Sequence, residues 1–170
     1  CRKIIFSSSA LVYDLSIGGI HKEDSPINPQ NPYGKTKASI ESFLSDVYNS
    51  DPKNWRIANL RYFNPIGAHH SGLIGENPTG IPNNIFPFMT QVALKKIEYL
   101  EVFGNDWDTY DGTGVRDYIH VMDLAEGHIA ALEHLLERDK EKICLNLGTG
   151  EGTSVFDLIN TFKKVNNLKL

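Results

Sequence analysis

The sequence predicts an α/β fold in which strands and helices alternate. Three short apolar runs, at 3–6, 57–63 and 143–147, have the character of buried parallel strands. Amphipathic segments with helix start signals lie between these runs. Strands that alternate with helices form parallel sheets through right-handed crossovers. We therefore expect a partial, doubly wound parallel sheet of the Rossmann type, with a smaller α/β substrate-binding domain beside it.

The first helix has the clearest signals. Asn31 suits an N-cap position, Pro32 suits the first helical turn, and the run Asn49-Ser50-Asp51-Pro52 ends the pattern. Within this helix an apolar stripe continues the face of Lys37, so that face is expected to point inward. The stripe consists of Ile40, Phe43, Leu44, Val47 and Tyr48.

The rest of the chain is divided by loop signals. Segment 64–84, rich in proline and glycine, is expected to be a long loop that lines a site. Beyond it the patterns predict a helix at about 85–97, a strand at 99–103, a polar loop at 105–114, and an extended segment at 118–121. A helix capped by Asp123 and running to about 137, a strand at 143–147, and a helix capped by Ser154 and running to about 165 complete the prediction.

Composition narrows the class of protein. The 170 residues carry a net charge of −4, which argues against a nucleic-acid partner. No apolar run approaches the ~20 residues that span a bilayer, so no membrane partner is expected. The two cysteines, Cys1 and Cys144, suggest a reducing, cytoplasmic setting. The adjacent His69 and His70 cannot easily chelate from one face, so no metal site is predicted.

The motif Tyr33-Gly34-Lys35-Thr36-Lys37 is the main candidate for chemistry. Residues four apart share a helix face, and an ammonium beside a phenol stabilises the phenolate, which can then act as a base. Ser9 follows a predicted strand, and open parallel sheets bind ligands beyond the carboxyl ends of their strands. The alternative is a half-buried tyrosine with a solvated lysine. The helix start and the serine-rich strand end favour a catalytic group of Ser9, Tyr33 and Lys37.

Two further residues suit anionic ligands, each with an equally plausible structural role. Asn64 follows a strand and offers an amide donor for a phosphate or sugar, or forms an Asn-Pro turn. Arg116 suits a phosphate, or pairs with Asp117 on the surface. Phe103 could stack on a base. The glycine-rich segment 148–154 is better interpreted as a tight turn into a capped helix than as a dinucleotide loop.

Several of these segments, in this order, resemble the UDP-glucose 4-epimerases of the extended short-chain dehydrogenase/reductase family, and the resemblance covers essentially the whole chain. The matched segments are Phe6-Ser7-Ser8-Ser9-Ala10, Asn31 to Lys37, Leu60 to Ala68, Gly80 to Asn84, Val102 to Asp106, and Asp111 to Val121.

This resemblance implies an enzyme that holds NAD and interconverts UDP-glucose and UDP-galactose by transient oxidation at C4. Tyr33 would be the base on the sugar 4-hydroxyl, Ser9 would lie between them, and Lys37 would hold the nicotinamide ribose. The implied cofactor-binding residues are Ser9, Tyr33, Lys37, Tyr62, Phe63 and Pro65. The implied substrate-binding residues are Ser9, Tyr33, Asn64, Asn84, Ile85, Glu101, Val102, Phe103 and Arg116. A homodimer is expected for the full-length protein.

The chain does not begin with Met and stops just after a predicted helix, so we expect a fragment. Residues 1–63 would be the C-terminal part of an NAD-binding Rossmann domain, and 64–170 mainly a UDP-sugar-binding region truncated at its C-terminus. The family's glycine-rich pyrophosphate loop does not occur in the sequence, so the isolated fragment is expected to be inactive.

Alternatives within the resemblance stay open. Another NAD-dependent nucleotide-sugar epimerase would share these residues. A 4,6-dehydratase needs an additional acid and base, whereas Ala10-Leu11 follows the serines. A non-catalytic NAD-binding interaction protein would typically lack Tyr33, Lys37 or Ser9.

Overall fold

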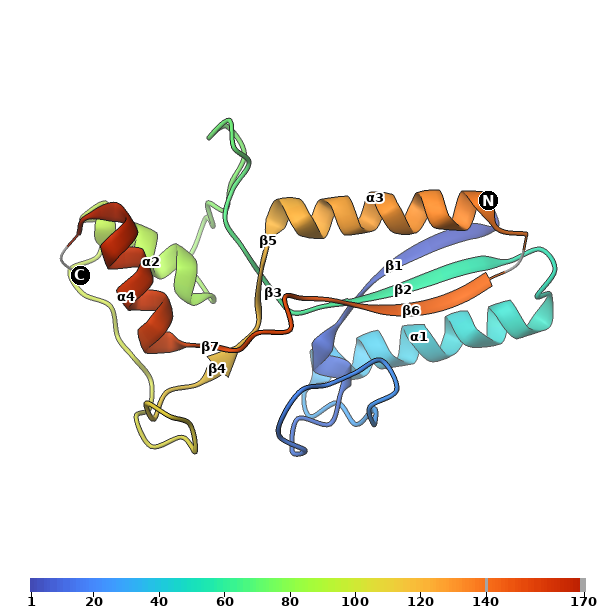
Figure 1. The fold of residues 1–170 in the computed structure, drawn as a ribbon, viewed down its shortest axis with the longest axis horizontal. Helices are drawn as coiled ribbons and strands as arrows, with labels where there is room; N and C mark the ends of the chain where they lie inside the picture. Colours follow the sequence, from blue (N-terminus) through green and yellow to red (C-terminus); the bar gives the residue numbers. More distant parts are fainter. Residues whose placement is uncertain (140, 169–170) are drawn as a thin grey trace.

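A three-stranded parallel sheet forms one half of the molecule (Figure 1). Its strands are β1 (Lys3–Ser9), β2 (Arg56–Tyr62) and β6 (Glu141–Leu147), in the order β1-β2-β6. Helix α1 (Pro32–Ser50) lies on one face of this sheet and helix α3 (Val121–Glu137) on the other. The predicted α/β class with a parallel sheet is confirmed. The computed structural model describes residues 1–139 and 141–168.

The strands end level with one another. Ser9 of β1 is the register partner of Tyr62 of β2, and Tyr62 in turn is the partner of Leu147 of β6. The strand expected at 143–147 does return to the sheet, beside β2, and begins two residues earlier than predicted. Three carboxyl ends therefore meet at one edge, where ligands bind in parallel α/β sheets.

The two faces of β2 are packed differently. Towards α3 the sheet buries an apolar cluster of Ala58, Leu60, Ala131 and Leu135, which is ordinary core packing. Towards α1 the same strand places Arg61, buried against Glu41 of the helix. Side chains alternate along a strand, so one strand supplies both an apolar and a charged face.

The other half of the molecule consists of short strands and two helices (Figure 1). β3 (Asn64–Ile66) pairs in parallel with β5 (Tyr118–His120), and β4 (Val115–Arg116) pairs antiparallel with β7 (Thr153–Ser154). Helices α2 (Ile85–Ala93) and α4 (Val155–Asn166) share a core of Met89, Leu158 and Ile159.

A 3₁₀ turn, η1 (Ala10–Val12), follows β1 directly.

Several boundaries differ from the prediction. Helix α2 ends at Ala93 rather than about 97, because Lys95 adopts a left-handed backbone with φ of 57°. The segment 99–103 forms no strand. Its Leu100 and Val102 pack against the Met89 core instead, without a neighbouring strand to pair with. β3 lies inside the stretch expected to be loop.

Two helix assignments were also wrong in detail. Helix α3 is capped by His120, whose Nδ1 accepts from the Met122 N–H at 3.2 Å, and not by Asp123. In α1 the inward face carries Gly34, Glu41 and Leu44, whereas Phe43 is 64% exposed. The predicted stripe is therefore partly correct: Leu44 is buried and Val47 and Tyr48 are half-buried, whereas Ile40 and Phe43 are exposed. Glu41 takes an inward position because it forms a buried ion pair with Arg61. Ser154 does cap α4, accepting from the Asp157 N–H at 3.0 Å.

Among the described residues, no helix combines the length and the apolar character that a membrane crossing requires.

Candidate functional site

The start of α1 places the motif tyrosine at the edge where the strands end. The Asn31 Oδ1 accepts from the Gly34 N–H at 2.7 Å, and Pro32 occupies the first turn, as predicted. Tyr33 lies in this first turn and is 47% exposed. Its phenol hydroxyl forms no hydrogen bond within the described part of the chain. A capped helix end therefore presents a free phenol at the surface.

Lys37 lies one turn further along and faces the strand end. Its Nζ donates to the carbonyl oxygen of Ser7 at 3.0 Å. The same nitrogen is 5.4 Å from the centre of the Tyr33 ring and 5.2 Å from that of Phe6. The ammonium is thus anchored to β1 beside the phenol, on the shared helix face that the spacing predicted.

Ser9 is the last residue of β1 and is almost fully buried. Its Oγ accepts from the Leu11 N–H at 3.2 Å, so the side chain caps the 3₁₀ turn η1. A hydroxyl that accepts one bond still has a hydrogen to donate. Ser9 can therefore donate to a ligand without giving up its structural bond.

Three residues predicted to contact a cofactor lie at or just after the end of β2. Tyr62 is half-buried, and burial raises the pKa of its phenol, with a further rise from the neighbouring Tyr33. The Phe63 N–H donates to the Leu147 carbonyl at 3.1 Å, which fixes the chain as it leaves the sheet. Pro65 is exposed on β3. Tyr62 thus neighbours Tyr33, and Phe63 packs on the cluster of Ala10, Val12 and Tyr13 that follows β1.

Asn64 lies on β3 and Arg116 on β4, two short strands that pair with different partners. The Asn64 N–H donates to the Asp117 carbonyl at 3.1 Å. Arg116 is exposed, and its Nη1 donates only to the carbonyl of Val115, at 2.8 Å. The alternative of an Arg116–Asp117 ion pair is not formed in the described chain. The guanidinium is therefore free to meet an anion.

The Asp117 carboxylate holds the glycine-rich turn after β6. It accepts from the Thr149 N–H at 2.9 Å, from the Thr149 hydroxyl at 2.7 Å and from the Gly150 N–H at 2.8 Å. Backbone N–H groups that a dinucleotide loop would offer to phosphate are thus satisfied within the chain. The interpretation of 148–154 as a tight turn into a capped helix is confirmed.

The remaining predicted residues are dispersed over the second half. Asn84 occupies the N-cap position of α2, with its Nδ2 3.5 Å from Glu76 Oε1. Ile85 and Val102 pack against the Met89 core. Glu101 is exposed, and Phe103 is 83% exposed. The structure brings Ser9, Tyr33 and Lys37 to one strand edge, and among the described residues no hydrogen bond or ion pair joins these remaining residues to them.

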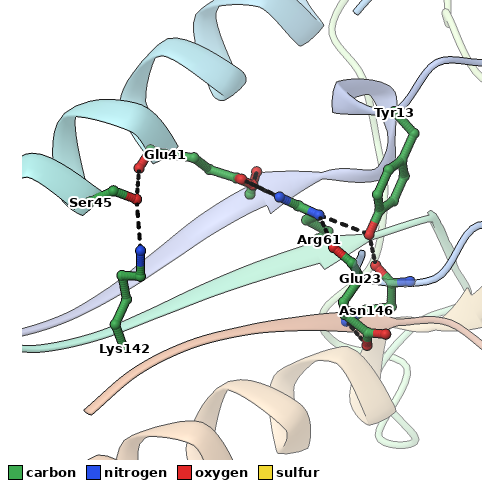
Figure 2. A network of polar contacts seen from close by, with 8 residues as sticks. Tyr13, Glu23, Glu41, Ser45, Arg61, Lys142 and Asn146 are labelled. Carbon is green, nitrogen blue, oxygen red and sulfur yellow. Dashed lines mark hydrogen bonds and ion pairs between the residues drawn. The ribbon is translucent and has the colours of Figure 1, made fainter. Parts of the chain in front are cut away.

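The sequence analysis missed a buried polar network beneath the strand edge (Figure 2). Glu41 and Arg61 form its centre, with Tyr13, Ser8 and Asn146 around them. A signal did exist. Glu41 interrupts the inward face of a helix, and Arg61 interrupts an apolar strand. Opposite charges at two otherwise apolar positions predict a buried pair.

Comparison with known proteins agrees with this geometry. Residues 1–148 match the NAD dependent epimerase/dehydratase family, and the chain belongs to this family. It is 54% identical over 170 residues to UDP-glucose 4-epimerase 4 of Oryza sativa subsp. japonica, covering 100% of this chain and 46% of that protein. It is also 54% identical over 164 residues to UDP-glucose 4-epimerase of Bacillus subtilis (strain 168), covering 96% of this chain and 48% of that protein.

The solved structures give the same result for the fold. The crystal structure of UDP-glucose 4-epimerase from Bifidobacterium longum in complex with NAD+ and UDP matches with a TM-score of 0.90 and 48% identity. The match covers 98% of this chain and 49% of that one. The chain therefore spans about half the length of the relatives that it matches.

Proposed function

We propose that this chain is part of a UDP-glucose 4-epimerase, which interconverts UDP-galactose and UDP-glucose with bound NAD. The observation that carries the proposal is the free phenol of Tyr33 beside the anchored ammonium of Lys37, at the carboxyl edge of a parallel sheet. Identity of 54% to a UDP-glucose 4-epimerase over the whole chain supports it.

The residues at this edge fit NAD. A phenol hydroxyl and an ammonium offer hydrogen-bond donors for the ribose hydroxyls, and Phe63 and Pro65 offer flat apolar surface beside them. Tyr62, half-buried at the end of β2, adds aromatic surface. We propose that Ser9, Tyr33, Lys37, Tyr62, Phe63 and Pro65 hold the cofactor. Bound NAD would accept a hydride from C4 of the sugar and return it.

The chain's own residues handle the proton. In the phenolate form Tyr33 would take the proton from the sugar 4-hydroxyl, since general bases act within hydrogen-bond reach. Lys37 lies beside the phenol ring, and its bond to Ser7 keeps it in place. Ser9 would donate its free hydroxyl hydrogen and orient the sugar oxygen. Tyr33 would return this proton to the sugar oxygen when the C4 hydroxyl is formed again.

We propose that the predicted substrate-binding residues of the second half of the molecule bind the nucleotide. Arg116, without a carboxylate partner, and the amides of Asn64 and Asn84 suit the diphosphate. The exposed ring of Phe103, with Glu101 and Val102 beside it, suits the uracil, and Ile85 adds apolar contact. Closure of this half over the substrate would bring the dispersed residues to the strand edge.

Further properties belong to the same proposal. Residues 1–63 would be the C-terminal part of the NAD-binding domain, and residues 64–170 mainly the UDP-sugar-binding region. The net charge of −4 is consistent with a small-molecule partner rather than nucleic acid. Both cysteines are free thiols, consistent with the cytoplasm. We propose a homodimer for the full-length protein.

The test is direct. The full-length protein would be purified, denatured, and assayed for released NAD, and the native protein would be incubated with UDP-galactose. Released NAD and formation of UDP-glucose without added cofactor are expected. Loss of water from the substrate would instead identify a dehydratase, and NAD binding with no turnover of any UDP-sugar would identify a non-catalytic protein.

A further inference from the structure

A buried ion pair lies below the proposed site, in a position that the proton chemistry does not use. Arg61 of β2 and Glu41 of α1 are 4% and 6% exposed. The Arg61 Nε donates to Glu41 Oε1 at 2.9 Å, and Nη2 donates to Oε2 at 2.6 Å (Figure 2). This two-pronged geometry fixes both side chains in direction as well as distance.

Glu41 also binds the strand that carries the proposed catalytic serine. The Ser8 hydroxyl donates to Glu41 Oε1 at 2.5 Å. Ser8 immediately precedes Ser9, and Glu41 lies one helical turn after Lys37. One carboxylate therefore joins the end of β1 to the helix that bears Tyr33 and Lys37.

The guanidinium extends this connection to a loop and a third strand. The Arg61 Nη1 donates to the Tyr13 hydroxyl at 3.0 Å and to the Glu23 carbonyl at 3.0 Å. The Tyr13 hydroxyl donates in turn to Asn146 Oδ1 of β6, at 2.6 Å. Figure 2 shows this chain of contacts running from α1 across the sheet.

Stability alone is a weak reason for such a pair. Burying two charges costs desolvation, and replacement of both by apolar residues is often neutral or stabilising. The pair does, however, hold α1 against β2 with directional bonds, which apolar contacts do not provide, and the Ser8–Glu41 bond then fixes β1 to the same carboxylate. Transition-state geometry is sensitive to displacements of about 1 Å.

We infer that Glu41, held by Arg61, is a positioning residue that fixes Ser9 on β1 against Tyr33 and Lys37 on α1 through its bond to Ser8. This role rests on the proposed epimerase function. Glu41 would touch neither sugar nor cofactor.

The chain offers a matched control. Arg2, just before β1, donates to Asp51 Oδ2, just after α1, at 2.9 Å. This pair joins the same strand and helix at their opposite ends, and both side chains are exposed. An exposed pair far from the strand edge has little influence on the site.

The experiment uses the full-length protein with Ser8→Ala, Glu41→Gln, the double variant Glu41→Met/Arg61→Met, and Arg2→Met. Conversion of UDP-galactose, bound NAD after purification, and Tm are measured for each. Ser8→Ala leaves the ion pair intact, and the double variant leaves no unpaired buried charge, so both are expected to fold.

We expect kcat to fall about 10- to 100-fold in Ser8→Ala and in the double variant, with KM and NAD content within about twofold of wild type. Arg2→Met should retain wild-type kcat. Glu41→Gln should lose activity and also Tm, since Arg61 loses its charged partner.

Recovery of wild-type kcat in the double variant, together with recovered Tm, would overturn the inference, because the pair would then be merely structural. Wild-type kcat in Ser8→Ala would overturn it as well. A wild-type protein that holds no NAD and converts no UDP-galactose would instead refute the proposed function, and the positioning role with it.

Discussion

The Lys37 ammonium lies 5.4 Å from the centre of the Tyr33 ring while it donates to the Ser7 carbonyl oxygen at 3.0 Å. One cation thus bonds to the end of β1 and lies beside the exposed phenol at the start of α1. The bond restricts the ammonium to one position, so its charge acts on Tyr33 from a fixed distance.

Replacing Lys37 by Met should lower kcat, because the proposed site loses the ammonium that lies beside the Tyr33 ring. Bound NAD should fall as well, since the proposed donor to the nicotinamide ribose is removed. Initial rates of UDP-galactose conversion and the NAD released from the purified full-length protein would measure both losses. Lys35→Met, at an exposed position of the same helix, is the control. Wild-type kcat and NAD content in Lys37→Met would assign Lys37 no part in the site.

Gly34 should tolerate no side chain. A Cβ at this position would lie 2.3 Å from the Leu11 carbonyl oxygen and 2.9 Å from Pro29 Cβ. Because the first contact is backbone, the start of α1 must move, and overpacking of this kind costs ~1–3 kcal/mol. Gly34→Ala should lower Tm and kcat together. Gly18→Ala, which would meet no atom within 4 Å, should change neither. Equal Tm values for the two variants would contradict this packing.

The sequence predicted the parts of the fold that local patterns determine. Asn31 and Ser154 cap helices as expected, and the apolar runs form the sheet. The failures share a cause, which is tertiary contact. Phe43 was expected to point inward because it is apolar, but it is exposed. Glu41 points inward because its partner is Arg61, twenty residues further along the chain.

The same limit applies to the candidate site. The spacing of Tyr33 and Lys37 is local, and the structure places them together as predicted. The residues from Asn84 to Arg116 depend on how the second half packs, which local patterns do not determine. The engagement of Asp117 by Thr149 is another long-range contact, and it separates Asp117 from Arg116.

Arg116→Ala should weaken nucleotide binding more than it slows the chemistry. A charge-assisted bond to phosphate contributes ~1.5–3 kcal/mol, or about 10- to 100-fold in Kd. Calorimetric titration of the full-length protein with UDP would measure the loss, with a smaller change expected in kcat. Arg138→Ala, another exposed arginine, is the control. Unchanged affinity for UDP would assign Arg116 no part in substrate binding.

Cys144 should weaken the fold at alkaline pH. Burial raises the pKa of its thiol from 9.0 to about 11. Above about pH 9 the thiol loses its proton in the unfolded chain but keeps it in the folded chain, which favours unfolding. The contribution of the buried thiol to the free energy of unfolding is therefore complete below about pH 9 and is lost as the pH rises through about 11. Burial of the Tyr13, Tyr62 and Tyr118 phenols adds a loss of the same sign above pH 10.0.

Urea unfolding of the full-length protein between pH 8 and pH 11 would isolate the thiol. The fall in unfolding free energy across this range should be smaller in Cys144→Ala by about 1–2 kcal/mol. Cys1→Ala, at an exposed thiol, should follow the wild-type slope. Identical slopes in all three proteins would mean that Cys144 titrates in the folded state as it does in the unfolded state.

The most direct test of the proposed chemistry is the kcat of Tyr33→Phe in the full-length protein, measured with UDP-galactose and with bound NAD quantified in parallel. Removing the hydroxyl takes away one of the proposed contacts to NAD but keeps the ring beside Lys37 and the other proposed cofactor residues, so NAD content and UDP affinity should fall far less than kcat. Loss of a general base is expected to lower kcat by ~10²–10⁴-fold. A variant that keeps more than about a tenth of wild-type kcat would show that another group takes the proton, and that Tyr33 is not the base.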